Sequence, residues 1–221
     1  MIKEYNLIFD FDSTFVKVET IEILAKISLQ KNNDRHAILD EIEKLTKSAM
    51  DGDISFPIAL EKRISLINLN KNIIKETIDD INDKITESIM DNNEFIKNNA
   101  DKCYIISGGF KEIIEPIANK FGINKNHIFA NTFIYNNDGD VISIDKKNPL
   151  SMENGKSIAA QNIIGKNIII GDGYTDYELK KNGKAKYFIQ YIENINRKNL
   201  NKYADYIANN FQDVLKYLYE K

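Results

Sequence analysis

The chain has 221 residues, of which 43% are hydrophobic and 29% are charged, and its formal net charge at pH 7 is -3. This length is enough for one well-buried domain, or for a core domain that carries a smaller insertion. Because charges of both signs are spread along the chain, it lacks the basic surface that nucleic acid or an anionic membrane requires, and we expect neither as a partner.

The cysteine and histidine content restricts the kind of metal site. Cys103 is the single cysteine, and His36 and His127 are the two histidines. An intrachain disulfide is therefore excluded, and any metal is expected to be hard and bound by oxygen. No apolar stretch approaches the roughly 20 residues of a membrane span, and no signal-type apolar core precedes the first predicted strand. The sequence therefore predicts a cytoplasmic location.

The first predicted strand, Leu7 to Phe9, is followed by two carboxylates. Its short apolar run suits a strand buried on both faces of a parallel sheet. Asp10 then lies just beyond the carboxyl end of the strand, where such sheets bind ligands. In the turn that follows, Asp10 and Asp12 can take different roles, one attacking while the other carries a proton. Alternatively, Asp12-Ser13-Thr14 is only a turn with helix-capping residues.

Residues 16–85 are predicted to form a small helical domain inserted directly after this strand. Apolar residues recur there at helical spacing, and Asp51-Gly52-Asp53 and Pro57 interrupt the helices as turn signals. The longest helical stripe consists of Ile74, Ile78, Ile81, Ile85 and Ile89. The predicted domains are therefore a core of residues 1–15 and 86–221 and an insertion of residues 16–85.

From Lys102 onward, predicted strands alternate with predicted helices. The strands are Cys103 to Ile106, Ile128 to Phe129, Asn167 to Ile170 and Lys186 to Ile189. A small β-hairpin joins Phe133–Tyr135 to Val141–Ile144, and the last helix carries an apolar face that includes Phe211 and Leu218. This alternation predicts an α/β fold with a doubly wound, Rossmann-like parallel sheet and helices on both faces.

Three of the strands end in polar turns, at residues 10–14, 107–109 and 171–176. Neighbouring carboxyl ends meet at one crevice of such a sheet, so we expect these turns to converge. Asp10, Asp172 and Asp176 would then form an acidic cluster suited to Mg²⁺. Ser107-Gly108-Gly109, predicted to open a helix, favours an anion such as phosphate. Taken singly, each turn could instead be ordinary helix capping.

Two stretches of the sequence resemble known phosphate-binding motifs but do not match them. Gly155-Lys156-Ser157 resembles the end of a P-loop, but Leu150 stands where that motif has its first glycine, and no strand precedes it. The stretch 171–176 ends in Asp where a dinucleotide-binding fingerprint has glycine. Lys156 remains available as a positive charge for the crevice, or as a surface lysine.

The order of these pieces is more specific than any one of them. They are Asp10-Phe11-Asp12-Ser13-Thr14, Ser107-Gly108-Gly109-Phe110, Lys156 and Gly171-Asp172-Gly173-Tyr174-Thr175-Asp176. In this order, and with a helical insertion after the first, the sequence resembles the phosphoserine phosphatases of the haloacid dehalogenase superfamily over nearly its whole length. The resemblance implies a core of that superfamily's fold, an inserted helical cap and Mg²⁺ as cofactor.

The resemblance also implies roles for individual residues. Asp10 would be the nucleophile and Asp12 the general acid and base, with Ser107 and Lys156 as further catalytic residues. The implied metal ligands are Asp10, Asp172 and the backbone carbonyl of Asp12, and Asp176 would orient Lys156 or metal-bound water. The implied substrate-binding residues are Glu19, Met50, Phe56, Arg63, Ser107, Gly108, Thr175 and Arg197. Among these, Glu19 and Arg63 match the residues that hold the ammonium and carboxylate of phosphoserine.

We therefore expect Mg²⁺-dependent hydrolysis of O-phospho-L-serine through an aspartyl-phosphate, as the last step of serine biosynthesis, by a monomer or homodimer. One alternative is a related phosphatase for another small phosphorylated metabolite. Another is a non-enzymatic phospho-aspartate receiver, against which the helical insertion and Asp12 argue. A third is a catalytically idle interaction protein, although all the motif side chains are present.

Overall fold

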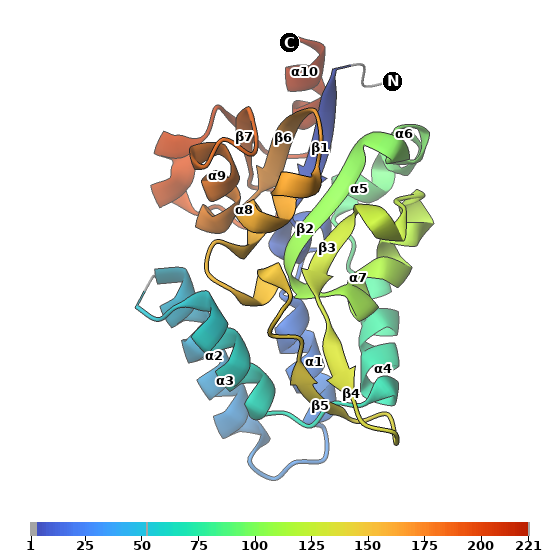
Figure 1. Ribbon diagram of the computed structural model, residues 1–221, viewed down its shortest axis with the longest axis vertical. Coiled ribbons are helices and arrows are strands. Elements are labelled where there is room, and N and C mark those ends of the chain that lie inside the picture. The colour runs from blue at the N-terminus through green and yellow to red at the C-terminus, as the bar shows by residue number, and fades with distance from the viewer. Residues whose placement is uncertain (1–3, 52, 221) are drawn as a thin grey trace.

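A parallel six-stranded sheet with the strand order β3-β2-β1-β6-β7-β8 forms the centre of the molecule (Figure 1). The computed structural model describes residues 4–51 and 53–220, except for the side chains of Met50 and Asp51. The strands are β1 (Tyr5–Phe9), β2 (Cys103–Phe110), β3 (Ile128–Asn131), β6 (Lys166–Gly171), β7 (Tyr187–Tyr191) and β8 (Tyr206–Ala208). The predicted α/β fold is confirmed, and the short edge strand β8 is an element that the sequence analysis missed.

Alternate residues of the central strands face two separate hydrophobic layers. In β1, Leu7 and Phe9 belong to the larger buried cluster and Ile8 to the smaller one, and all three side chains are fully buried. The larger cluster includes apolar residues of α5 (Glu87–Asp91), α7 (Lys111–Ala118) and α10 (Phe211–Tyr219). The smaller includes residues of α8 (Gly155–Ala159) and α9 (Tyr174–Lys181). Burial on both faces explains the continuous apolar runs of the strands.

Residues 16–85, which we refer to as the cap segment, lie beyond the carboxyl end of the sheet, and their described part contains four helices (Figure 1). These helices are α1 (Thr20–Ser28), α2 (Arg35–Asp51), α3 (Phe56–Ser65) and α4 (Lys71–Asn82). The hairpin of β4 (Phe133–Tyr135) and β5 (Val141–Ile144) reaches from the core to this segment, where Val141 N donates to Leu69 O at 2.8 Å. The division of the chain into core and cap domains stays a prediction.

The long isoleucine stripe is not one helix. Helix α4 ends at Asn82, Ile85 forms an isolated antiparallel bridge with Val16, and Ile89 lies in α5, ahead of α6 (Asn93–Asn98). The spacing of apolar residues indicates only which side chains are buried. It can therefore continue across a turn when the segments before and after the turn bury their side chains against the same part of the core.

No helix in the described part of the chain is long and apolar enough to cross a membrane.

Candidate active site

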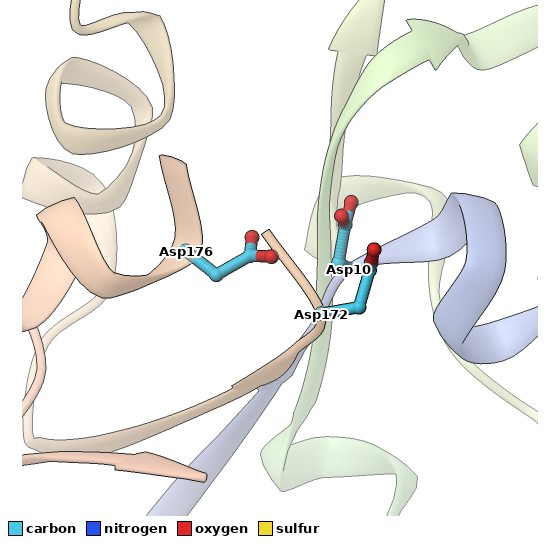
Figure 2. A group of neighbouring side chains, drawn as sticks. All are labelled: Asp10, Asp172 and Asp176. Atoms are coloured by element: carbon cyan, nitrogen blue, oxygen red, sulfur yellow. The ribbon is translucent and has the colours of Figure 1, made fainter. Parts of the chain in front are cut away.

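Three carboxylates meet at the carboxyl ends of β1 and β6 (Figure 2). Asp10 follows β1, Asp172 follows β6, and Asp176 points toward them from the first turn of α9. One ligand oxygen from each lies within 4.8 Å of those of the other two. Because β1 and β6 are hydrogen-bonded neighbours, the two strand ends deliver their carboxylates to one place, as the sequence predicts.

A tight turn at Phe11–Phe15 orients the two acidic residues of the first motif. Phe11 N donates to Asp10 Oδ1 at 2.8 Å, and Val16 N closes the turn onto Phe11 O at 3.0 Å. Asp12 Oδ1 accepts hydrogen bonds from Thr20 N at 2.9 Å and from the Thr20 hydroxyl. The pKa of Asp12 rises to about 6, mainly because the carboxyl is buried. Asp12 is therefore fixed by the first residue of the cap helix α1.

Lys156 lies inside the site rather than on the surface. Its Nζ is 2.8 Å from Asp10 Oδ1 and 2.7 Å from Asp176 Oδ1. Burial alone would lower the pKa of Lys156, but the charges of Asp10 and Asp176 outweigh burial and raise it. Asp176 also accepts from Gly173 N at 2.9 Å. A Cβ on Gly171 would lie 2.3 Å from Asp176 Cγ, so this contact requires glycine.

The residues around Asp172 fit a hard divalent cation. Asp172 accepts from Thr14 Oγ1 at 3.3 Å and from Arg197 Nε at 2.8 Å. Burial, and then repulsion by Asp10, raise the pKa of Asp172 and bring that of Asp176 to about 7. A cation beside these carboxylates would relieve that repulsion, and the donors are all carboxylate oxygens, as Mg²⁺ prefers.

The second motif lies within a strand rather than at the start of a helix. Strand β2 continues through Ser107 and both glycines to Phe110, and its register against β3 shifts between Ile106 and Phe110. The prediction that Ser107 opens a helix is thus wrong, because glycines that suggest a turn instead permit an irregular strand. The Ser107 hydroxyl accepts from Gly109 N at 2.9 Å. A Cβ on Gly108 would lie only 2.6 Å from Phe56 Cζ, so the cap segment closes directly onto this strand.

A cavity of about 570 Å³ lies between these motifs and the cap segment. Its lining includes the predicted residues Asp10, Asp12, Glu19, Phe56, Arg63, Ser107, Gly108, Lys156, Asp172, Thr175 and Arg197. Asp176 does not line the cavity; it contacts Lys156 and is fully buried. The Met50 side chain lies outside the described residues. Apart from Met50 and Asp176, the structure therefore brings the predicted site residues to one cavity.

Two ionisable residues, the half-buried Glu19 and the buried Arg63, face this cavity from the cap side. Glu19 accepts from Ser13 Oγ at 2.7 Å, and burial, reinforced by Asp12, raises its pKa to about 8. Arg63 is 6% exposed and donates to Ala59 O at 3.2 Å and Thr46 Oγ1 at 3.1 Å. Within the described part of the chain Arg63 makes no salt bridge, and burial lowers its pKa. The cavity thus offers a guanidinium without a carboxylate partner.

Sequence reasoning missed the residues that support these side chains. Thr20 holds Asp12 and Thr46 holds Arg63, yet neither threonine belongs to a recognisable motif. The position of Thr20 as the first residue of α1 was a possible signal. Thr46 offered none, because its contact depends on how α2 packs against α3.

Comparison with known proteins places this site in a family. A family model described as haloacid dehalogenase-like hydrolase matches residues 7–181. The chain is 31% identical over 212 residues to the chloroplastic phosphoserine phosphatase of Arabidopsis thaliana, covering 94% of this chain and 69% of that protein. A crystal structure of a phosphoserine phosphohydrolase-like protein from Francisella tularensis is 36% identical, with a TM-score of 0.84 and coverage of 96% of this chain and 99% of that one. A phosphoserine phosphatase structure with a phospho-aspartyl intermediate analogue is 29% identical, with a TM-score of 0.77 and coverage of 97% and 99%.

Proposed function

The chain belongs to the haloacid dehalogenase-like hydrolase family, and from this premise we propose that it hydrolyses O-phospho-L-serine to L-serine and phosphate. One observation carries the choice of substrate. The buried guanidinium of Arg63, which has no carboxylate partner in the described part of the chain, shares a cavity with the carboxyl of Glu19 and the carboxylate of Asp10. A phosphorylated amino acid supplies a carboxylate, an ammonium and a phosphate to these three groups.

Asp10 is the proposed nucleophile. Its Oδ1 is held by Phe11 N and Lys156 Nζ, each at 2.8 Å, so Oδ2 is the oxygen that attacks phosphorus. The new bond joins Oδ2 to phosphorus as the bond from phosphorus to the serine oxygen breaks. Water then attacks the aspartyl-phosphate and releases phosphate, which divides one difficult step into two easier ones.

Asp12 is the proposed acid and base. Because Thr20 occupies Oδ1, Oδ2 is available to give a proton to the departing serine oxygen and later to take one from the attacking water. A pKa of about 6 suits both roles near neutral pH, and such catalysis contributes typically about 10²- to 10⁴-fold.

The phosphoryl group is held by groups from three parts of the chain. We assign its oxygens to the Ser107 hydroxyl, the Gly108 amide and Lys156, with Thr175 and Arg197, which also line the cavity, as further contacts. Asp10, Asp172 and the backbone carbonyl of Asp12 would hold Mg²⁺. When bound, the ion screens the repulsion between an anionic nucleophile and an anionic phosphate.

The cap segment selects the amino-acid end of the substrate. Arg63 would bind the carboxylate through charge-assisted hydrogen bonds worth about 1.5 to 3 kcal/mol each. Glu19 would bind the ammonium, while Phe56, packed on Gly108, and Met50 would close the pocket and exclude water. The same proposal includes a role as the last step of serine biosynthesis, a cytoplasmic location and a monomeric or homodimeric state.

The experiment that tests this function is phosphate release with and without Mg²⁺ from phosphoserine, phosphothreonine and several sugar phosphates. We expect phosphoserine to have the highest kcat/KM. A higher value for a sugar phosphate would contradict the proposed substrate and favour a related phosphatase. A long-lived aspartyl-phosphate without turnover would indicate a receiver module.

A further inference from the structure

The two segments that connect the cap segment to the core form an antiparallel pair. Val16 bridges Ile85, Lys17 N donates to Lys84 O at 2.9 Å, and Thr86 N donates to Phe15 O at 3.0 Å. The first of these segments leads directly out of the turn that carries Asp10 and Asp12. A shift at this junction therefore reaches both carboxylates through the backbone.

Asn194, in the loop after β7, donates both to the turn that precedes this junction and to the junction itself. Its Nδ2 lies 3.1 Å from Ser13 O and 2.7 Å from Thr86 Oγ1, which uses both hydrogens of the amide. Thr86 Oγ1 in turn donates to Thr14 O at 2.6 Å. Ser13 has a φ of 54°, in the left-handed region that residues other than glycine seldom adopt. The unusual turn is thus supported from outside by the side chains of Asn194 and Thr86.

The loop that carries Asn194 is anchored on both sides of it. On one side, Glu193 accepts from Ser88 N at 3.0 Å and from Tyr191 OH at 2.7 Å. On the other side, Arg197 contacts Asp172 at 2.8 Å. The loop around Asn194 is therefore tied to α5 and to a carboxylate of the site, and these contacts can fix the position of the turn.

We propose that Asn194 is a positioning residue, which holds the turn of Asp10 and Asp12 in its reactive geometry and ties that geometry to the junction of the cap segment. Without the amide, the carbonyl of Ser13 loses its donor and the turn can relax. A displacement of about 1 Å at a reacting group costs on the order of 10²-fold in rate. The effect on catalysis rests on the proposed phosphatase function, whereas the effect on the junction does not.

The test uses the full chain with Asn194→Ala, and Asn196→Ala as a control, because Asn196 is exposed on the same loop. For Asn194→Ala we expect kcat for phosphoserine to fall about 10- to 100-fold. KM should stay within about threefold, because Arg63, the proposed partner of the substrate carboxylate, is held by Ala59 and Thr46 rather than by this turn. Hydrogen exchange at the amides of Lys17 and Thr86, measured in ligand-free protein, should become at least about tenfold faster. Asn196→Ala should change neither quantity.

Thr86 supplies a second, independent pair of variants. Thr86→Val removes the hydroxyl that accepts from Asn194 and should reproduce the loss of kcat, whereas Thr86→Ser should retain activity. If both residues act through one hydrogen-bonded unit, Asn194→Ala combined with Thr86→Val should lose little beyond either single variant. This pair decides the question if Asn194→Ala does not fold.

The inference is overturned if, in Asn194→Ala, the amides of Lys17 and Thr86 both exchange at the wild-type rate. It is also overturned if the wild-type protein is an active phosphatase and Asn194→Ala has the same kcat. If the wild-type protein hydrolyses no phosphomonoester, the proposed function has failed, and hydrogen exchange alone decides. Faster exchange at the junction then supports the positioning role of Asn194, and unchanged exchange refutes it.

Discussion

Lys156 Nζ lies 2.8 Å from Asp10 Oδ1, in a pair that is almost fully withdrawn from solvent. The lysine also contacts Asp176, so one cation is shared between the proposed nucleophile and a second buried carboxylate. This arrangement fixes which of the two oxygens of Asp10 is available. Lys156, from a distant part of the sequence, therefore determines which oxygen of the proposed nucleophile Asp10 is free to react.

Replacing this nucleophile should stop the reaction. Asp10→Asn keeps the size of the side chain but removes its negative charge, so turnover of phosphoserine should fall by more than about 10⁴-fold, as when other covalent nucleophiles are removed. Labelling with radioactive phosphate, followed by acid quenching, should detect no aspartyl-phosphate. Asp138→Asn, on the exposed hairpin turn, is the control and should keep full activity. Substantial turnover by Asp10→Asn would refute the assignment.

Removing the guanidinium in the cavity should affect one class of substrate. Arg63→Met retains much of the apolar packing but loses the carboxylate contact, so kcat/KM for phosphoserine should fall about 10- to 100-fold for each hydrogen bond lost. The value for a simple aryl phosphate should change by less than about threefold, since it has no carboxylate. Lys62→Met, at an exposed position of the same helix, should alter neither. Equal losses on both substrates would remove the case for carboxylate recognition.

Glu19 should make phosphoserine binding depend on pH. Its pKa of about 8 means that the carboxyl is mostly neutral at pH 7 and becomes ionised as the pH rises. Because only the ionised form pairs with an ammonium, KM for phosphoserine should fall by up to about tenfold between pH 7 and pH 8.5. Glu19→Gln should abolish this dependence, whereas the exposed Glu41→Gln should leave it intact. A KM that rises over this range in the wild-type enzyme would contradict the proposed role.

The contact between Phe56 and Gly108 should limit what the second motif tolerates. A Cβ at position 108 would approach Phe56 Cζ to 2.6 Å, so Gly108→Ala should push the cap segment outward and lower kcat/KM by about 10-fold or more. Adding Phe56→Leu to Gly108→Ala should recover part of the lost kcat/KM, because the smaller side chain relieves the clash. Steady-state kinetics of the two single variants and the double variant measure the coupling. Strictly additive losses would show that the contact is not the cause.

Mg²⁺ should stabilise the folded protein as well as support activity. A ligand that binds only the folded state at 100 times its Kd adds about 2.7 kcal/mol, which corresponds to a rise in Tm of roughly 5 to 10 °C for a chain of this size. Asp172→Asn removes a proposed ligand and should suppress the rise seen by calorimetry. Asp138→Asn should preserve it, and a chelator should reverse it. An equal shift in Asp172→Asn would place the ion elsewhere.

The local features of the fold were predictable from the sequence because they depend on neighbouring residues. A strand buried on both faces is apolar along its length, which identifies Leu7 to Phe9 and Ile168 to Ile170. Parallel strands place their carboxyl ends at one edge, so the sequence alone indicates that Asp10 and Asp172 meet.

Tertiary packing decided what these local rules leave open. Which strands are neighbours, where β2 stops and where the isoleucine stripe breaks depend on contacts between distant segments, as does the addition of β8 at the sheet edge. The partners of the site residues, Thr46 beside Arg63 and Asn194 beside Ser13, have no local signature. Burial, which raises the pKa values of Asp12 and Glu19, is likewise a property of the whole fold, because it depends on which distant side chains exclude water from each carboxyl.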